Sequence, residues 1–310
     1  MRVPAKVNLQ LSVGPLRPDG YHDLVTVFHA ISLADDVTVT LADGDSVTVT
    51  GEGAGQVPAD RDNLALRAVA ALRAATRAAT ASGKANAPGV AVTIRKRIPV
   101  AAGLAGGSAD AAATLVACNE LWDTRLSQRE LCEVGASVGS DVAFAVLGGT
   151  AVGRGRGEDL SPALVSATRY HWVLAFADAA LSTPEVYGTL DRLRDNRDNE
   201  VAQPSPRPEL SAELMGALRA GDPGRLGGSL SNDLQAAAIS MLPALRKTLA
   251  AGREFGALGA LVSGSGPTCF FLSRDASHAT DLAVALSGAG VCRAVARAVG
   301  PAPGASVIER

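Results

Sequence analysis

A run of small residues at positions 99–112 is the part of this sequence best suited to chemistry. It reads P-V-A-A-G-L-A-G-G-S-A-D-A-A and lies between an expected strand and an expected helix. Such a loop lets its backbone N–H groups approach an anion, and the helix N-terminus adds free donors and a positive dipole end. Ser108 offers a hydroxyl for a phosphate or a phosphate-bound Mg²⁺. This order favours phosphate binding over a tight turn before a packed helix, although the P-loop and dinucleotide-binding fingerprints are both absent.

Two other glycine-rich stretches could also serve as binding loops. Residues 152–157, V-G-R-G-R-G, have the right composition, but polar, turn-like residues follow them instead of a helix, so we expect a structural loop. Residues 263–268, S-G-S-G-P-T, lie between two apolar segments. A tight hairpin would need fewer glycines and hydroxyls, and the local residues leave a turn and a binding site equally open.

Asp141 is the strongest candidate for a general base. It follows Gly139 and Ser140 and precedes the apolar run 142–147, in which a lone acid is conspicuous. Burying a carboxylate without a partner is costly, which predicts a nearby cation. Lys6, a single charge in the N-terminal strand, is the natural candidate. The alternatives are a helix cap for Asp141 and an edge-strand charge for Lys6.

Tyr21 and His22 directly follow a turn sequence, R-P-D-G, at residues 17–20. They could present an aromatic face and ring nitrogens to a base or a sugar. The alternative, a tyrosine packed at the start of a strand, is the one that the residues alone favour. The other histidines show no metal-ligand spacing: His29, His171 and His278.

Composition and charge restrict the class of protein. The 310 residues amount to about two domains, and 29 basic against 31 acidic residues give a net charge of -2. This balance excludes a broad basic face for nucleic acid or an anionic membrane. No apolar run approaches the ~18 residues of a membrane-spanning helix, and the N-terminus lacks the apolar core of a signal peptide. We expect a reduced, cytoplasmic setting with no disulfide framework or zinc site, because the cysteines show no C-x-x-C spacing: Cys118, Cys132, Cys269 and Cys292.

Hydrophobic periodicity predicts strands and helices without strict βαβ alternation, which favours an α+β fold. Strands are expected at residues 7–13, 24–33, 36–41, 46–50, 90–96, 170–176, 257–262, 268–272 and 291–299. Helices are expected at residues 63–79, from the glycine-rich loop to about 122, after 127, and at 185–194, 209–220, 242–251 and 276–286. Asp62 should cap the first helix, and Ser127 with Glu130 forms a capping box. The proline-rich residues 203–208 read as a linker or exposed loop.

Taken together, these motifs resemble those of the GHMP kinase superfamily. Residues 99–112 are similar to its phosphate loop, P-x-x-x-G-L-[GA]-G-[GS]-S-[SA]. Other motifs resemble those of the superfamily's kinases for a cytidine diphosphate-linked methylerythritol, in the non-mevalonate isoprenoid pathway. They occur in the same order and cover nearly the whole chain, at residues 4–9, 17–22, 62–64, 139–142, 232–234 and 263–268. The chain departs from the pattern at Ala109 and Asp110, where relatives often carry Ser-Asn, and at Ala143, where proline is frequent.

The resemblance implies a role for each matched position. Lys6 and Asp141 would be the catalytic pair, with Asp141 accepting the proton of the acceptor hydroxyl and Lys6 holding that oxygen. Tyr21 and Tyr187 would sandwich the cytosine, while His22 would hydrogen-bond its edge. The positions implied for the substrate are Asn8, Tyr21, His22 and Tyr187. Those implied for ATP are Asn63, Lys96, Pro99, Val100, Ala101, Ala102, Gly103, Leu104, Ala105, Gly106, Gly107, Ser108 and Ala109, with Asn63 and Lys96 towards the adenosine and Ser108 also towards the metal.

The resemblance also implies a fold of two subdomains with the active site in the cleft between them. A ribosomal-protein-S5-like N-terminal domain would span residues 1–165 and a ferredoxin-like C-terminal domain residues 166–310. The implied cofactors are ATP and Mg²⁺. The implied partner is a small-molecule substrate, not nucleic acid or a membrane, and the chain would be a monomer or a weak homodimer.

Two rival functions stay open from the sequence. The first is another superfamily kinase that acts on homoserine, mevalonate or a sugar. Tyr21, His22 and Tyr187 argue against it, since only a nucleotide-linked acceptor offers a flat base to stack on. The second is a non-catalytic ATP-binding sensor. The presence of both Lys6 and Asp141 argues against it, because a sensor needs no base.

Overall fold

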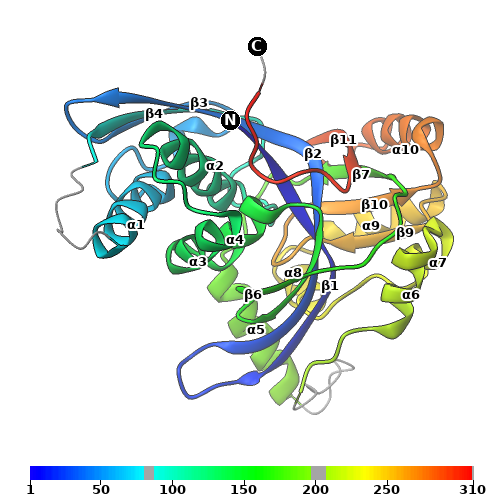
Figure 1. The fold of residues 1–310 in the computed structure, drawn as a ribbon. Helices are drawn as coiled ribbons and strands as arrows, with labels where there is room; N and C mark the ends of the chain where they lie inside the picture. Colours follow the sequence, from blue (N-terminus) through cyan, green and yellow to red (C-terminus); the bar gives the residue numbers. More distant parts are fainter. Residues whose placement is uncertain (80–86, 197–206, 309–310) are drawn as a thin grey trace.

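A long antiparallel pair of strands, β1 (Arg2–Leu16) and β2 (His22–Ala42), is the centre of the fold. In the computed structural model, which describes residues 1–79, 87–196 and 207–308, this pair runs through the middle of the molecule (Figure 1). Three register shifts between the two strands let so long a ribbon bend and twist. The predicted turn between them is confirmed, and Gly20 adopts a left-handed φ of 81° there.

β2 connects most of the first sheet. It pairs with β4 (Gly89–Lys96) along one half and with β5 (Thr150–Gly155) along the other. β3 (Ser46–Gly51) lies parallel to β4, β6 (Asp159–Pro162) antiparallel to β5, and β8 (Ser231–Asn232) parallel to β1. The order is therefore β3-β4-β2-β1-β8, with β5 and β6 off this path. β8 reaches β1 only at Gln10 and Leu11, so Lys6 has β2 on one side, and on the other side its N–H donates to the Leu104 carbonyl.

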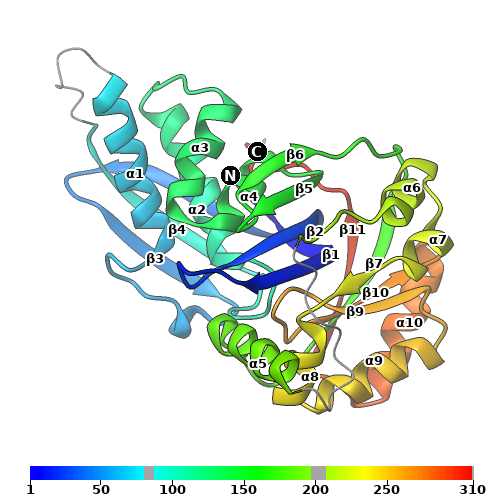
Figure 2. The ribbon, with the colours of Figure 1, turned by 90° about the horizontal axis from the view of Figure 1, so that it is seen from below.

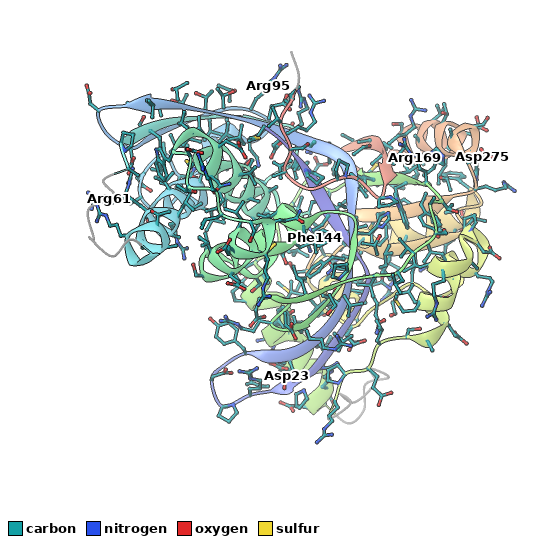
Figure 3. All side chains as sticks on the ribbon, viewed as in Figure 1. Asp23, Arg61, Arg95, Phe144, Arg169 and Asp275 are labelled. Atoms are coloured by element: carbon teal, nitrogen blue, oxygen red, sulfur yellow. The ribbon has the colours of Figure 1, made fainter. Side chains whose placement is uncertain are left out.

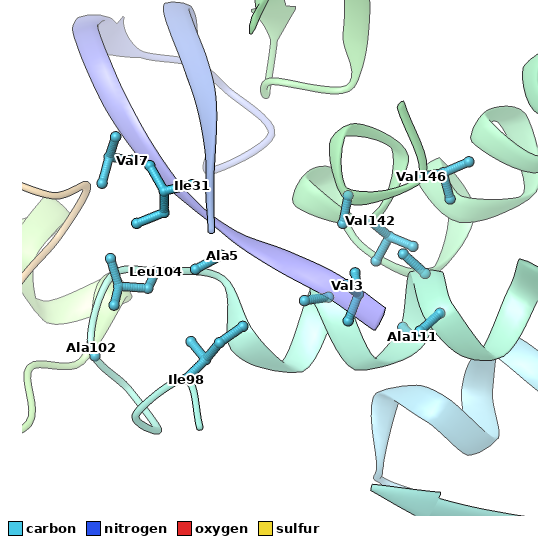
Figure 4. Close-up of a cluster of buried hydrophobic side chains, with 14 of the residues drawn as sticks. Val3, Ala5, Val7, Ile31, Ile98, Ala102, Leu104, Ala111, Val142 and Val146 are labelled. Carbon is cyan, nitrogen blue, oxygen red and sulfur yellow. The ribbon is translucent and has the colours of Figure 1, made fainter. Parts of the chain in front are cut away.

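Four helices cover this half: α1 (Leu64–Ala79), α2 (Gly106–Leu121), α3 (Gln128–Val138) and α4 (Ser140–Leu147). α1, α2 and α4 contact the sheet, and α3 packs on these three helices. A short 3₁₀ turn, η1 (Ala54–Gln56), precedes them. α2 is rich in alanine and has nine buried residues, as expected of a helix enclosed by neighbours. Figure 4 shows Val3 and Ala5 of β1 above α2, with Val3 towards Val142 of α4, and Val7 farther along the strand beside Ile31 of β2.

The second sheet is wholly antiparallel, with the order β11-β7-β10-β9. Its strands are β7 (Tyr170–Phe176), β9 (Gly259–Val262), β10 (Cys269–Ser273) and β11 (Ala294–Gly300). The helices of this half are α5 (Thr183–Asp195), α6 (Ala212–Ala220), α7 (Pro223–Gly228), α8 (Gln235–Met241), α9 (Ala244–Glu254) and α10 (Ala276–Gly288). Figure 2 shows α5 beside the hairpin end of β1 and β2, and its Val186 and Leu190 side chains share a buried cluster with residues of the second sheet.

The two halves share buried surface and chain segments. One apolar cluster continues from Val3 in the first sheet to Trp172 and Leu261 in the second. The C-terminal segment returns to the N-terminal half, where Ser306 bridges Arg2, and Figure 1 shows this red segment passing the start of β1. Figure 3 shows the same organisation in the side chains, with Phe144 inside and charged residues such as Asp275 at the periphery. A domain division at residues 165 and 166 stays a prediction.

Most of the expected elements are present, and the α+β prediction is confirmed. The strands expected at 46–50, 90–96 and 170–176 and the helices expected at 63–79 and 276–286 have ends within two residues of those predicted. The capping box is also confirmed, since the Ser127 side chain accepts from the Glu130 N–H and Glu130 accepts from the Ser127 N–H. Among the described residues, no helix is long and apolar enough to cross a membrane.

Two strands expected at residues 24–33 and 36–41 are in fact one, β2, so that prediction is wrong. Only Ala34 and Asp35 separate the two predicted strands, and aspartate is rare inside a strand. However, the Asp35 carboxylate is fully buried and accepts hydrogen bonds from the N–H groups of Arg97 and Ile98 and from the Lys96 ammonium. These donors satisfy the carboxylate inside the sheet, and the strand continues through it.

The glycine-rich residues 152–157, expected to be a structural loop, instead include strand β5 and its turn into β6. Gly153 is needed there for close packing, because a Cβ atom would lie 2.8 Å from Cε2 of Phe28. The cap of α1 also differs from the prediction. Asn63, not Asp62, accepts from the N–H of Ala65 through its side-chain oxygen. The expected linker at 203–208 lies mostly outside the described residues.

The packing of α9 on the second sheet predicts a stability change. A Cβ atom on Gly252 would lie 2.0 Å from Cε1 of the buried Phe271 ring, so Gly252→Ala should lower the free energy of unfolding by ~1–3 kcal/mol. Gly216→Ala in α6, where the nearest atom would be 3.7 Å away, is the matched control and should be neutral or slightly stabilising. Urea unfolding of both variants measures the difference, and equal midpoints would contradict this packing.

Candidate active site

One cavity of about 730 Å³ gathers most of the residues singled out from the sequence. It is bordered by β1 and β2, the glycine loop (residues 99–109), the start of α4, α5 and the loop at 263–268. The predicted residues that line it are Lys6, Asn8, Tyr21, His22, Ala101, Ala102, Gly103, Ala105, Gly106, Gly107, Ser108, Asp141 and Tyr187. The predicted residues outside its lining are Asn63, Lys96, Pro99, Val100, Leu104 and Ala109.

Lys6 and Asp141 meet in this cavity, as expected. The Lys6 Nζ atom lies 3.7 Å from Oδ2 of Asp141, an ion-pair distance longer than a hydrogen bond. Nζ also donates to Oδ1 of Asn8 at 2.7 Å, and Nδ2 of Asn8 donates to Oγ1 of Thr26 at 2.8 Å. The Thr26 hydroxyl in turn donates to the Gln10 carbonyl. This chain of bonds fixes the direction of the lysine from within the sheet.

The surroundings of Asp141 differ from those expected. Its side chain is 29% exposed, so it is not buried in the apolar run that follows it. It is also not a helix cap, because Gly139 occupies the N-cap position of α4 and no side chain caps that helix. Asp141 lies in the first helical turn, where the helix dipole favours a negative charge. The helix start, together with Lys6, therefore stabilises the carboxylate.

The glycine loop adopts an unusual backbone for its sequence. Ala101 and Ala105 have φ angles of 50° and 59°, in the left-handed region that alanine rarely adopts. Ala105 occupies the N-cap position of α2 without a side-chain bond. Gly103 is also left-handed, and a Cβ atom there would lie 2.2 Å from the carbonyl oxygen of Ser263. The loop is thus pressed against the segment at 263–268.

That segment, left open as a turn or a binding site, is part of the wall of the cavity. Gly264 and Ser265 line it. The Ser263 hydroxyl donates to the Gly103 carbonyl at 3.0 Å, and the Ser265 hydroxyl lies 2.9 Å from that of Thr183 at the start of α5. The 263–268 loop therefore connects the glycine loop to the helix that carries Tyr187.

A buried charge cluster lies beneath the glycine loop. The Lys96 ammonium donates to Asp35 at 2.5 Å and to Asp110 at 2.7 Å, and all three side chains are almost completely buried. A Cβ atom on Gly106 would lie 3.0 Å from the Lys96 Nζ atom, which places the ammonium directly under the loop. The resemblance directs Lys96 towards the adenosine, but this ammonium is engaged within the protein because the buried carboxylates require a cation.

Asn63, the other residue implied for the adenosine, is also buried. Besides capping α1, it donates from Nδ2 to the Pro58 carbonyl at 2.7 Å. Both polar atoms of its amide are thus used by the protein. Its place beside the ATP stays a prediction, and the structure assigns it a structural role at the start of α1.

Burial and charge perturb the acid–base properties of this cluster. Burial raises the pKa of Asp110 to about 8, with the nearby Asp35 adding to the effect and Lys96 opposing it. Burial alone would lower the pKa of Lys96, but the two carboxylates raise it overall. The cluster therefore keeps Lys96 charged, and the Asp110 carboxyl holds a proton to a higher pH than an exposed carboxyl does. The Oδ1 atom of Asp110 is buried without a hydrogen-bond partner, in the part of the chain that the structure describes.

The far end of the cavity gathers aromatic side chains. The His22 and Tyr187 rings lie 5.1 Å apart at an angle of 34°, and the Arg156 guanidinium lies 5.1 Å from the ring centre of the exposed Tyr21. Burial, with the charge of Asp141 adding to it, raises the pKa of Tyr187 well above its usual range. A flat ligand could therefore stack among these rings.

Sequence reasoning missed two residues at this end of the cavity. Arg156 belongs to residues 152–157, which were expected to form a structural loop. The glycines on either side drew attention to the backbone of this stretch, whereas the Arg156 side chain reaches the cavity. Asp191 bonds His22 through Oδ1 at 2.9 Å. Its position four residues after Tyr187 was a usable signal, since residues at this spacing share one face of a helix.

Comparisons with known proteins agree with this architecture. The sequence profile of the GHMP kinases N terminal domain matches residues 63–149, and that of the GHMP kinases C terminal matches residues 214–292. A crystal structure of a 4-(cytidine 5'-diphospho)-2C-methyl-D-erythritol kinase superposes with a TM-score of 0.72 at 33% identity, covering 96% of this chain and 98% of that chain. A homoserine kinase from Cytophaga hutchinsonii shares the fold at 20% identity, with a TM-score of 0.69, covering 96% of this chain and 92% of that chain.

Two relatives extend the similarity over the full length. The 4-diphosphocytidyl-2-C-methyl-D-erythritol kinase of Mycolicibacterium smegmatis is 54% identical over 308 residues, 99% of this chain and 92% of the relative. The enzyme of the same name from Nocardia farcinica is 55% identical over 309 residues, 100% of this chain and 96% of the relative. The chain therefore belongs to the GHMP kinases and, among them, to the family of 4-diphosphocytidyl-2-C-methyl-D-erythritol kinases.

The close approach at Gly106 predicts an effect on ATP binding. A Cβ atom there would already lie 3.1 Å from Cγ2 of Ile98, so Gly106→Val must displace the loop and its N–H groups. Because charge-assisted hydrogen bonds are worth ~1.5–3 kcal/mol each, ATP affinity should fall on the order of tenfold or more. Calorimetric titration with ATP measures this. Gly44→Val, at an open position, is the control, and unchanged affinity in a folded Gly106→Val protein would argue against phosphate binding by the loop.

The raised pKa of Asp110 predicts a pH dependence of stability. The folded protein retains a proton that the unfolded chain releases above its ordinary pKa of 3.8, so unfolding free energy falls as the pH rises towards about 8. The loss is at most ~1.4 kcal/mol per pH unit. Asp110→Asn should reduce this fall, whereas Asp43→Asn, an exposed control, should not. Urea unfolding between about pH 5 and pH 8 tests it, and parallel curves for wild type and Asp110→Asn would rule out the buried proton.

Proposed function

We propose that this chain transfers the γ-phosphoryl group of ATP to the 2-hydroxyl of 4-diphosphocytidyl-2-C-methyl-D-erythritol. One observation carries the proposal. The ion pair of Lys6 and Asp141 lies in the same cavity as the glycine loop and the aromatic group formed by Tyr21, His22 and Tyr187. A phosphate-binding loop, an acid–base pair and a base-stacking surface are the three parts that this reaction requires.

The glycine loop would hold the ATP phosphates. Its backbone N–H groups and the N-terminus of α2 would face the charge that spreads over the transferring phosphoryl oxygens. The Ser108 hydroxyl and the Asp141 carboxylate are oxygen donors of the kind that Mg²⁺ prefers. They belong to neighbouring segments, because a Cβ atom on Gly139, two residues before Asp141 in the chain, would lie 4.0 Å from the Ser108 hydroxyl. When bound, Mg²⁺ would neutralise phosphate charge. No group of three or more possible metal-ligating side chains occurs within the described ranges, so the phosphates would supply most of its ligands.

Lys6 and Asp141 would act on the acceptor. A tertiary alcohol is weakly acidic and crowded, so a positioned carboxylate that takes its proton speeds the attack. Asp141 would accept this proton, while the Lys6 ammonium, aimed by Asn8, would hold the hydroxyl oxygen and stabilise its developing negative charge. The partial exposure of Asp141 lets a substrate reach it.

The aromatic end of the cavity separates this reaction from that of other GHMP kinases. Homoserine, mevalonate and simple sugars have no flat base to place beside Tyr21 and Tyr187, whereas a cytidine diphosphate has one. Arg156, a cation on the Tyr21 ring, adds positive charge near a diphosphate. The same proposal includes the non-mevalonate isoprenoid pathway, a monomer or weak homodimer and a cytoplasmic location. The four free cysteines support that location.

An acceptor panel tests the proposal. ATP consumption should depend on 4-diphosphocytidyl-2-C-methyl-D-erythritol and should stay at the background rate with mevalonate, homoserine or galactose. Phosphorus NMR of the product should show a new phosphomonoester at the 2-position and an intact diphosphate. Efficient turnover of a panel member without a base would favour the rival kinase, and no turnover of any acceptor would favour the sensor.

The general base gives a sharper prediction. Asp141→Asn keeps the shape of the side chain but removes the proton acceptor, so kcat should fall by ~10²–10⁴-fold while ATP and substrate still bind. Lys6→Met should also lower kcat, and the double variant should be little worse than the poorer single one, because the two residues act together. Asp43→Asn is the exposed control. Near-native kcat for Asp141→Asn would exclude a base in this role.

A further inference from the structure

We infer that Asp191 is a positioning residue that makes the cavity selective for cytosine over uracil, by fixing which nitrogen of His22 carries the proton. The inference rests on the proposed function, since it assumes that a pyrimidine nucleotide occupies the aromatic end. It concerns a contact between β2 and α5 that no motif in the sequence contains.

The contact is short and largely shielded from water. Nε2 of His22 lies 2.9 Å from Oδ1 of Asp191, and the two side chains are 5% and 30% exposed. His22 is the first residue of β2, and Asp191 lies in α5. Both residues also line the cavity. This hydrogen bond therefore joins the N-terminal sheet to a helix of the other half at the edge of the binding site.

The chemistry of the pair decides the tautomer. An ionised carboxylate can only accept hydrogen bonds, so the Nε2 atom of His22 must carry a hydrogen. In a neutral imidazole the other nitrogen, Nδ1, then has a free lone pair and acts as an acceptor. Within the described part of the chain, no hydrogen bond involves Nδ1 of His22. A ligand that reaches Nδ1 of His22, a residue that lines the cavity, would thus meet an acceptor.

The position of the His22 ring fits recognition of a base edge. It lies beside Tyr187, with ring centres 5.1 Å apart, so a base stacked on that tyrosine would bring its edge to the imidazole. Cytosine and uracil differ at position 4, where cytosine has an amino donor and uracil a carbonyl acceptor. An Nδ1 acceptor pairs with the amino group and leaves two acceptors facing each other for uracil. Sites of this kind discriminate strongly, because the wrong ligand leaves polar groups unpaired.

Without Asp191, no carboxylate would hold the proton on Nε2 of His22, and the preference for cytosine would be lost. The imidazole could then place its proton on either nitrogen and rotate, since the bond that orients it is lost. The tautomer with a proton on Nδ1 would offer a donor, which suits the uracil carbonyl. Removal of Asp191 should therefore weaken CDP binding and improve UDP binding relative to it.

Isothermal titration with CDP and UDP tests this on the full chain. Wild type should prefer CDP, and Asp191→Ala should reduce the ratio of CDP to UDP affinity by about tenfold, the share of one hydrogen bond to a matched base edge. ATP affinity should not change. Asp195→Ala is the matched control, since Asp195 lies one turn further along α5, is exposed and does not line the cavity.

Nitrogen NMR of the imidazole rings reports the tautomer of His22 directly. This measurement would not change if Asp191 only stabilised the fold. The chain has only 4 histidines, so a His22→Gln spectrum assigns the signals of His22. At ~pH 8.5, where histidine is ordinarily neutral, we expect a protonated Nε2 in wild type and a mixture of tautomers in Asp191→Ala. CDP should shift the Nδ1 signal of wild type.

The outcomes separate this inference from the proposed function. A wild-type protein that neither binds CDP nor phosphorylates the cytidine-linked substrate would overturn both. A wild-type protein that does both would overturn this inference alone if Asp191→Ala kept the full preference for CDP. A proton on Nδ1 of His22 in wild type would have the same consequence.

Discussion

The Lys96 ammonium, shared between two buried carboxylates, is the interaction on which the site depends. Asp35 belongs to β2, Lys96 to the end of β4 and Asp110 to the first turns of α2, so one cation holds three elements together. A buried cation without its carboxylates, or the carboxylates without their cation, would be strongly destabilising. The glycine loop runs from β4 to α2 directly above this cluster. Its two ends are therefore fixed from below by charge.

The opposite side of the loop is fixed by the other half of the chain. Ser263 bonds the Gly103 carbonyl, and Ser265 contacts the start of α5, which carries Tyr187 and Asp191. Neither half of the molecule therefore forms the cavity alone. The N-terminal half supplies the Lys6–Asp141 ion pair together with Tyr21 and His22, and the second half supplies one wall and Tyr187, so the spacing between them depends on packing across the shared apolar cluster.

The family resemblance paired Lys6 with Asp141, and local patterns in the sequence predicted the α+β class and most elements. They failed where a distant partner changes the meaning of a residue. Asp35 reads as a strand break until its donors from β4 are present, and the V-G-R-G-R-G stretch reads as a loop until the Phe28 ring is seen against Gly153. Such partners are separated by tens of residues and leave no local periodicity.

The two left-handed alanines of the glycine loop affect the free protein before any nucleotide arrives. A glycine visits many backbone conformations at low cost, whereas Ala101 and Ala105 have few besides the one that their neighbours impose. A loop with fewer alternatives loses less conformational entropy on binding, and preorganisation of this kind increases affinity. The methyl groups of the two alanines thus restrict the conformations of the ligand-free loop. The accompanying backbone strain is compensated by the rest of the fold.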